Sequence, residues 1–469
     1  MSSANEILGP HDRPSIGRWI PLSFQHVFAM FGATILVPLL TGLSTSTALF
    51  TAGTGTLLYI LVTGAKVPSY LGSSFAFIPA LIAIGQNYGP EYAMGGSIFA
   101  GLFYALVALI IKLAGRKWID KVLPPVVIGS VIIVIGMSLA PTAIGEALYN
   151  NGNYSLVYGS IALVTLSVAI IATIFFRGFF NTLSILIGLV GGYIFTLIMG
   201  LIFPQYKLID FDIVRDANWF GLPFLHTDEN GKYFYMAPKF NLVAILTFVI
   251  VSIATMCEHL GDVLTTSKVV GKNFYEDPGL HRTLLGDGLA TAWAALWGGP
   301  PNTTYGENIG VMAITKVYSV WVIGGAAVIA IILSFCQKFG ALIQTIPTPV
   351  LGGICILLYG LIASSGLRTI VESGVDYQNK RNLTISSVIM VIGIGGGLLK
   401  FNINVGGNPF TFQLGSVALA TVVGIILRTE FNAGDVRQAR HDAVFPDLDD
   451  DVLELLRSFQ TAEGVDFQL

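Results

Sequence analysis

An apolar stretch of the chain is broken near residue 300 by the sequence Pro300-Pro301-Asn302-Thr303-Thr304-Tyr305-Gly306-Glu307. A second break, Gly72-Ser73-Ser74-Phe75, interrupts an earlier apolar stretch. Proline lacks a backbone donor and glycine weakens helices, so each break predicts a short extended segment rather than a continuous helix. At membrane depth, irregular backbone persists only where it lines a cavity or packs against protein. If the surrounding sequence spans a membrane, paired breaks predict a binding site, and a packed kink is the alternative.

The composition shows that the surrounding sequence does span a membrane. Of the 469 residues, 54% are hydrophobic and 11% are charged, whereas roughly a quarter are charged in a soluble domain. Apolar runs of about 20 residues, enough to cross a ~30 Å hydrocarbon core as helices, recur along the chain. They lack the alternation of barrel strands. We therefore expect an all-α polytopic membrane protein with the lipid bilayer as a partner.

Several other functions lack sequence support. The basic residues are dispersed rather than gathered into a stripe, so no nucleic-acid binding is expected. The three cysteines lie in or beside apolar segments without the spacing of a disulfide framework or a metal site. Motifs for ATP binding, zinc proteolysis and serine hydrolysis are missing from the sequence. We expect neither an enzyme nor a cofactor or metal.

Fourteen candidate spans can be counted between Gly, Pro and charged residues. They begin near Leu22, Thr47, Tyr70, Tyr92, Pro124, Leu156, Leu183, Leu242, Leu284, Asn302, Val320, Pro349, Leu383 and Thr411. With a cytoplasmic amino terminus, this count leaves only six of the 25 basic residues outside: Lys207, Arg215, Lys232, Lys239, Lys338 and Lys400. The positive-inside rule then predicts that both termini are cytoplasmic.

The two halves of the chain share a motif. Pro125-Val126-Val127-Ile128-Gly129 is matched by Pro349-Val350-Leu351-Gly352-Gly353 at an offset of 224 residues. Gly136 and Gly360 follow at that same offset. The motifs begin spans 5 and 12, and the breaks fall in spans 3 and 10, so we predict a seven-plus-seven inverted repeat. Chance similarity between two Gly- and Pro-rich segments is the alternative.

Ionisable residues inside spans are costly and are functional candidates. They are His26, Glu258, His259, Asp262, Asp287 and Glu307. Glu258 and Asp262 are four residues apart on one helical face, where their mutual repulsion favours retention of one proton. That property suits a proton-coupled carrier. As alternatives, Asp262 pairs with Lys268 at a wet helix end, Asp287 lies close to a loop, and both histidines are packing residues.

Span 10 carries a family signature. Its residues Glu307-Asn308-Ile309-Gly310-Val311-Met312-Ala313-Ile314-Thr315-Lys316 resemble the motif of the nucleobase–ascorbate transporter (nucleobase:cation symporter-2) family. Further matches are Gln25-His26, Gly72-Ser73-Ser74-Phe75-Ala76-Phe77 and Glu258-His259-Leu260-Gly261-Asp262. The resemblance runs from about Ile20 to Arg428. Glu307 is similar to the uracil permease branch, because the purine and ascorbate branches usually carry Gln or Pro there.

The resemblance implies a core (transport) domain and a gate domain. The core would comprise residues 22–115 and 241–336, and the gate residues 123–203 and 347–428. The remaining parts would be a cytoplasmic tail (1–21), a long outward loop (204–240) and an acidic cytoplasmic tail (429–469). A multi-pass protein of the bacterial cytoplasmic (inner) membrane is expected, with a homodimer as a possible assembly.

The resemblance also implies a uracil permease that imports its substrate with a proton by alternating access. Its substrate-binding residues would be Ala33, Ser74, Phe75, Glu258, Tyr305, Gly306, Glu307 and Tyr359. Proton coupling would involve Glu258, His259, Asp262 and Glu307, although some relatives carry His at position 262. Gln25, His26, Asn308 and Thr315 would support the site. Alternatives are a xanthine, urate or other nucleobase carrier of the family, and an anion exchanger or channel of the same architecture.

Overall fold

The computed structural model describes residues 7–206, 208–227, 233–405 and 408–430, and nearly all of the predicted acidic tail lies outside them. The helices are α1 Ile16–Thr41, α2 Thr45–Val62, α3 Ile78–Asn87, α4 Pro90–Ala114, α5 Lys117–Val122, α6 Pro125–Ser138, α7 Ala140–Leu148, α8 Leu156–Phe175, α9 Phe179–Thr182, α10 Ser184–Ile202, α11 Asp212–Asp216, α12 Leu242–Val270, α13 Leu280–Leu296, α14 Gly306–Thr315, α15 Val320–Ser334, α16 Gln337–Gln344, α17 Thr348–Glu372, α18 Lys380–Ile394 and α19 Ser416–Glu430. Short helical turns are η1 Phe75–Phe77, η2 Pro204–Tyr206 and η3 Tyr275–Gly279. The strands are β1 Leu71–Ser73, β2 Tyr149–Asn150, β3 Asn153–Tyr154, β4 Leu225–Thr227, β5 Tyr233–Tyr235, β6 Asn302–Thr304, β7 Leu399–Val405 and β8 Asn408–Leu414.

The helices confirm a multi-pass membrane protein. Within the described residues, eight helical segments are long and apolar enough to cross a membrane, and the bent pair α15–α16 would make nine. The predicted count of fourteen exceeds this number, because predicted spans 3, 9, 10, 13 and 14 form helices of 10, 17, 10, 15 and 15 residues. The predicted start of span 14 at Thr411 is wrong. Thr411 lies in β8, and α19 begins at Ser416, consistent with the preference of aromatic and β-branched residues for strands.

The two predicted breaks form short strands that pair with each other. β1 and β6 are antiparallel, with Leu71 opposite Thr304 and Ser73 opposite Asn302. At the two ends of the pair, Ser74 N donates to Pro301 O at 2.8 Å and Tyr305 N donates to Tyr70 O at 3.0 Å. The backbone groups freed by each break are therefore bonded across the pair, as buried peptide groups require.

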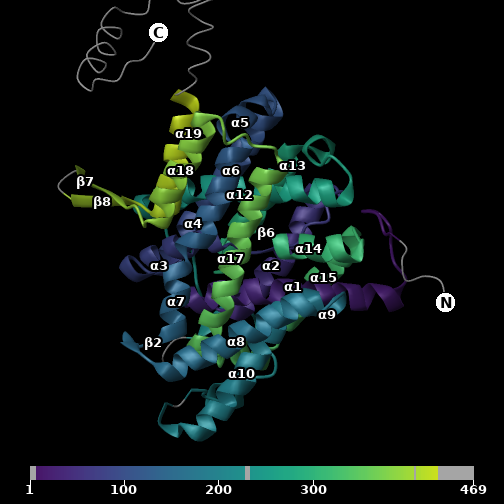
Figure 1. Cartoon of the computed structure of the whole chain (residues 1–469), viewed down its shortest axis with the longest axis vertical. Coiled ribbons are helices and arrows are strands. Elements are labelled where there is room, and N and C mark those ends of the chain that lie inside the picture. Colours follow the sequence, from purple (N-terminus) through teal and green to yellow (C-terminus); the bar gives the residue numbers. More distant parts are fainter. Residues whose placement is uncertain (1–6, 207, 228–232, 406–407, 431–469) are drawn as a thin grey trace, which may run out of the picture. The chain divides into compact units, whose positions relative to one another are not determined.

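Two sets of helices pack among themselves. One set contains α1, α2, α4, α12, α13 and α15, and the other contains α6, α7, α8, α10, α17 and α18. Small residues bring the helices close: a Cβ at Gly101 would lie 2.4 Å from Gly288 O, between α4 and α13. Likewise, a Cβ at Gly366 of α17 would lie 2.5 Å from Gly129 O of α6. Figure 1 shows α6 and α17 side by side.

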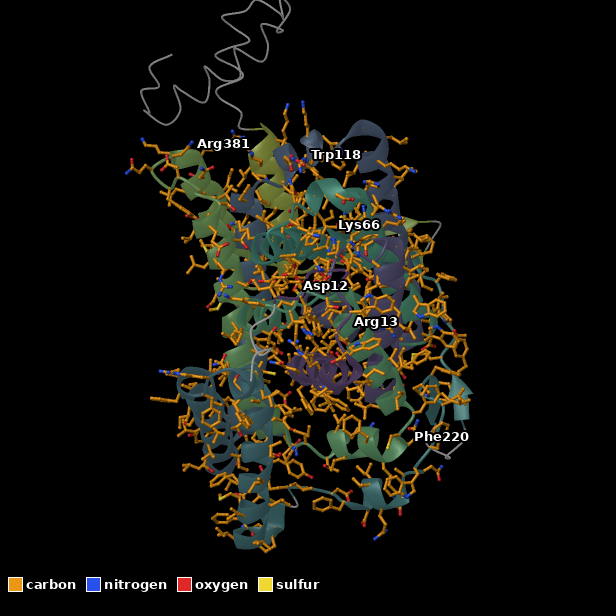
Figure 2. The ribbon with its side chains drawn as sticks, turned by 90° about the vertical axis from the view of Figure 1, so that its right-hand side faces the viewer. Asp12, Arg13, Lys66, Trp118, Phe220 and Arg381 are labelled. Carbon is orange, nitrogen blue, oxygen red and sulfur yellow. The ribbon has the colours of Figure 1, made fainter. Side chains whose placement is uncertain are left out.

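Residues from predicted inward and outward segments lie apart. Figure 2 shows Lys66, from the connection after α2, and Trp118, from the short helix α5, towards one end of the view. Phe220, from the segment between α11 and α12, lies towards the opposite end. Lys66 forms an ion pair with Asp277 of η3, so two connections are joined at the first of these ends.

Gly72 is predicted to be essential for the strand pair. A Cβ at this position would lie 2.5 Å from Cζ of Tyr305, whose ring covers β1. We expect Gly72→Ala to destabilise the protein by about 1–3 kcal/mol, because the buried ring has to shift. Thermal unfolding in detergent measures this effect. Gly200→Ala is the control, since nothing lies within 4 Å of a Cβ there, and equal melting temperatures for the two variants would contradict the prediction.

Candidate functional site

A cavity of about 270 Å³ lies where the strand pair meets α12, α14 and α17. Its polar lining consists of Glu258, Asp262, Thr265, Thr303, Thr304, Glu307, Ser364, Ser365 and Arg368, and its aromatic lining of Phe75 and Tyr305. Ser364 and Arg368 are exposed, whereas Phe75 and Tyr305 are each 3% exposed. The cavity therefore runs from a polar, exposed rim on α17 to a buried aromatic end beside the strands.

The start of α14 supplies backbone donors to this cavity. The helix begins at Gly306 directly after β6, and no side chain caps its first turn. Gly306 lines the cavity, and a Cβ there would lie 3.7 Å from Asp262 Oδ1. The first N–H groups of a helix have no partner within it and carry partial positive charge. They can donate hydrogen bonds to a carbonyl oxygen of a ligand.

Three carboxylates line the same cavity. Glu258 and Asp262 come from successive turns of α12, and Glu307 from the first turn of α14. Asp262 Oδ2 accepts a hydrogen bond of 2.8 Å from Thr304 Oγ1. Glu258 Oε2 is buried and has no hydrogen-bond partner in the described part of the chain. A buried acceptor left unpaired is costly, so this site suits a ligand with N–H donors or a bound proton.

The alternative pairing of Asp262 with Lys268 is wrong. Lys268 Nζ instead lies 3.0 Å from Glu372 Oε2, at the end of α17. Asp287 is also not a loop residue, because it is fully buried and its Oδ2 lies 3.3 Å from His259 Nδ1. This second pair lies outside the cavity lining, apart from the three carboxylates, and His26 belongs to neither group.

Other predicted residues hold the broken helices in place. Asn308 Nδ2 lies 3.1 Å from both Nδ1 and O of His26, which joins α14 to α1. Thr315 Oγ1 accepts from Val317 N at 3.3 Å, just after the end of α14. Gln25 is buried on α1. None of these four residues is among the residues that line the cavity, and their supporting role remains a prediction.

The structure divides the predicted substrate-binding set. Phe75, Glu258, Tyr305, Gly306 and Glu307 line the cavity together. Ala33, Ser74 and Tyr359 are buried outside its lining, and their contacts with a ligand remain predictions. Tyr359 still lies close to it, because its ring centroid is 5.8 Å from that of Phe75 in an edge-on arrangement.

Sequence reasoning missed several cavity residues. Thr304 belongs to the second of the two predicted breaks, but its hydrogen bond to Asp262 joins residues 42 positions apart, so the sequence did not indicate it. Ser364 and Arg368 are four residues apart on α17, and that shared face could have indicated them.

The chain matches known proteins over most of its length. The family described as the Permease family matches residues 17–400. The uracil permease of Bacillus caldolyticus is 51% identical over 422 residues, covering 90% of this chain and 94% of that protein. The chain belongs to the nucleobase–ascorbate transporter family. The uracil permease of Bacillus subtilis (strain 168) is 48% identical, and the match covers 91% of this chain and 95% of that protein. The uracil permease of Escherichia coli (strain K12) is 43% identical, and the match covers 90% of this chain and 94% of that protein. These relatives are transporters, and this member of the family is not an enzyme.

Solved structures resemble the chain in fold. The transmembrane domain of the cyanobacterial bicarbonate transporter BicA has a TM-score of 0.58 at 15% identity, covering 90% of this chain and all of that domain. The murine anion transporter Slc26a9 in its inward-facing state has a TM-score of 0.62 at 10% identity, and the match covers 89% of this chain and 68% of that chain. At these identities the likeness shows the fold alone. This member of the nucleobase–ascorbate transporter family therefore shares its fold with membrane transporters.

The bond between Thr304 and Asp262 is predicted to stabilise the site. Thr304→Val keeps the side-chain shape but leaves Asp262 Oδ2 without its donor, which should cost about 1–3 kcal/mol. Neighbouring Thr303→Val is the matched control, because Thr303 Oγ1 is buried without a partner among the described residues. Thermal unfolding of both purified variants measures the difference. If Thr303→Val were the less stable variant, the bond would not contribute as proposed.

Proposed function

We propose that this chain imports uracil together with a proton by alternating access. The observation that carries the proposal is the meeting of Glu258, Glu307 and the start of α14 in one cavity lined by Phe75 and Tyr305. Relatives named uracil permease, at 43–51% identity over about 90% of the chain, support it.

The cavity is chemically complementary to uracil. The base offers two N–H donors and two carbonyl acceptors around a flat ring. Glu258 and Glu307 can accept from the N–H groups, since ionised carboxylates are acceptors only. Backbone N–H groups at Gly306 and Phe75 can donate to the carbonyl oxygens, and the rings of Phe75 and Tyr305 can pack against the base. In the proposal, Ala33 and Ser74 complete the pocket and Tyr359 approaches from α17.

A proton can supply the driving force. Uracil is neutral near pH 7, so the membrane potential alone does not concentrate it. One cotransported charge contributes ~2.3 kcal/mol per 100 mV, equivalent to roughly fifty-fold accumulation. We assign the proton to the group of Glu258, Asp262 and Glu307, because a proton shared among neighbouring carboxylates relieves their repulsion. His259, behind this group and beside Asp287, is a second candidate carrier.

The proposed architecture is fourteen spans in two inverted halves. The core (22–115 and 241–336) would move against the gate (123–203 and 347–428), and the two self-packing sets of helices support this division. The antiparallel pairing of β1 with β6 and the close contact of α6 with α17 support the repeat. In the proposed topology, the protein lies in the inner membrane of a bacterium and both tails, 1–21 and 429–469, are in the cytoplasm. The loop 204–240 is then on the outer side of that membrane. The proposed assembly is a homodimer.

Two alternatives remain testable. Another nucleobase, such as xanthine or urate, would suit the family, but Glu307 favours the pyrimidine branch. An anion carrier of the same architecture is the second alternative, and BicA and Slc26a9 show that this fold also occurs in anion transporters. Three carboxylates in the cavity oppose that alternative, because they would repel an anion.

Uptake by membrane vesicles tests the proposed function. Labelled uracil should accumulate against its gradient when a proton gradient is imposed, and a protonophore should abolish the accumulation. Unlabelled uracil should compete, whereas xanthine and chloride should not. Accumulation that requires sodium and survives the protonophore would refute proton coupling, and competition by xanthine or chloride would refute the substrate.

The ion pair of Lys268 and Glu372 tests movement of the core against the gate. It joins α12 to α17, and both side chains are about 40% exposed, at 42% and 41%. If the ion pair forms in only one state of the transport cycle, breaking it should shift the balance between the states. Exposed pairs contribute about 0.2–1 kcal/mol. Lys268→Glu or Glu372→Lys should therefore change the thiol labelling rate of a cysteine placed at Ala313 by about two- to fivefold. Ala313 lines the cavity and is exposed.

The native cysteines would be replaced by alanine in this experiment. The charge-swapped double variant should restore the labelling rate of the parent, because it rebuilds the pair. A double variant whose effect equals the sum of the single effects would contradict a state-dependent ion pair.

A further inference from the structure

A second cavity-like feature lies on the surface formed by α1, α2 and α15. It is an open apolar groove of about 860 Å³, lined among others by Trp19, Phe24, Ile60, Trp321 and Leu333. The groove has almost no polar lining, and it follows α15 from its first turn to its last. In a membrane protein, such a surface groove is in contact with lipid acyl chains.

One end of the groove carries a fixed cation. The guanidinium of Arg13 lies 5.1 Å from the ring centroid of Trp19 and 5.2 Å from that of Trp321. The two rings meet edge to face at 6.1 Å, and Trp19 Nε1 donates to Trp321 O at 2.6 Å. Tryptophan side chains are enriched where a membrane meets water, so we expect Arg13 to lie at headgroup depth.

Backbone hydrogen bonds hold Arg13 in this position. Residues 8–12 run along the segment between α14 and α15, where Tyr318 N donates to Leu8 O at 2.7 Å and Val320 N donates to Pro10 O at 2.9 Å. Ser319 Oγ donates to the carbonyl of Asp12 at 2.6 Å. Figure 2 shows Asp12 and Arg13 beside the helices, between Lys66 and Phe220 in that view. The cation is therefore part of a built structure rather than of a loose tail.

A second guanidinium lies near the same end. Ala65 lines the groove, and a Cβ at its neighbour Gly64 would lie 3.5 Å from Arg282 Nη1. Neither Arg13 nor Arg282 has an acidic partner among the described residues, whereas Lys66 is paired with Asp277. Two unpaired guanidinium groups beside an apolar groove match a molecule with an anionic head and a hydrocarbon tail.

We propose that an anionic phospholipid occupies this groove. Its acyl chain lies along α1 and α15, and its phosphate lies at Arg13 and Arg282. Arginine suits this contact because its planar fork matches phosphate geometry, and basic residues at a membrane surface attract anionic lipids. A zwitterionic lipid fills the groove less well, since its own ammonium group competes for the phosphate. The inference depends on the membrane setting and not on the transported substrate.

Thermal unfolding of the full-length protein in detergent tests the proposal. Phosphatidylglycerol should raise the melting temperature by several degrees more than phosphatidylcholine of the same acyl chains. This lipid-dependent difference should fall by at least half in Arg13→Gln/Arg282→Gln. Arg13→Lys/Arg282→Lys should keep most of it. Because each variant is compared with itself in the two lipids, a change in its basal stability does not affect the result.

Two controls distinguish the groove from other sources of the effect. Lys338→Gln removes a different cation, 5.5 Å from the ring centroid of Trp219, and should leave the lipid-dependent difference unchanged. Glycerol 3-phosphate, a soluble headgroup, should not stabilise the protein because it lacks the acyl chain. An undiminished difference in Arg13→Gln/Arg282→Gln, an equal effect of both lipids, or full stabilisation by glycerol 3-phosphate would overturn the proposal.

Discussion

The structure depends on one constraint: two broken helices must satisfy their backbone hydrogen bonds away from water. β1 and β6 meet this requirement by pairing with each other, and the pair positions everything around it. Gly72 provides space for the ring of Tyr305, whose hydroxyl donates to Ser73 O at 3.0 Å. β6 ends at Thr304 and α14 begins at Gly306, so the first turn of α14 lies directly beside the strand pair. The free N–H groups of this turn are therefore close to α12. The binding cavity is thus a consequence of how the breaks are paired.

The same arrangement concentrates negative charge. Glu258, Asp262 and Glu307 line one small cavity, and within the described residues only Asp262 accepts a side-chain hydrogen bond there, from Thr304. A protein selected for stability alone would not keep Glu258 Oε2 buried and unpaired. A substrate with N–H donors can donate a hydrogen bond to this oxygen and so reduce the cost of burying it. A bound proton can do the same, and it also reduces the repulsion among the three carboxylates. In the proposed function, substrate binding and proton binding would be coupled, because both would act on the same carboxylates.

Much of this site could be predicted from the sequence because its signals are local. Pro300, Pro301 and Gly72 mark the breaks, and a spacing of four places Glu258 and Asp262 on one face. The bond from Thr304 to Asp262 and the pairing of Lys268 with Glu372 join distant segments, so no local pattern could reveal them. The contact of Asp287 with His259 could not be predicted for a similar reason, since the two residues lie on different helices. The span count exceeded the long helices because apolar composition does not report where a helix is interrupted.

Equilibrium binding of uracil to purified Glu307→Gln tests whether Glu307 accepts a hydrogen bond from the substrate. The change removes an ionised acceptor and adds donors that need new partners, so uracil affinity should fall by at least about tenfold. The melting temperature should remain near that of the parent, because the change removes a buried charge rather than adding one. Glu276→Gln, at an exposed carboxylate of η3, should bind uracil as the parent does. Unchanged affinity in Glu307→Gln would contradict the account and make Glu307 a structural residue of α14.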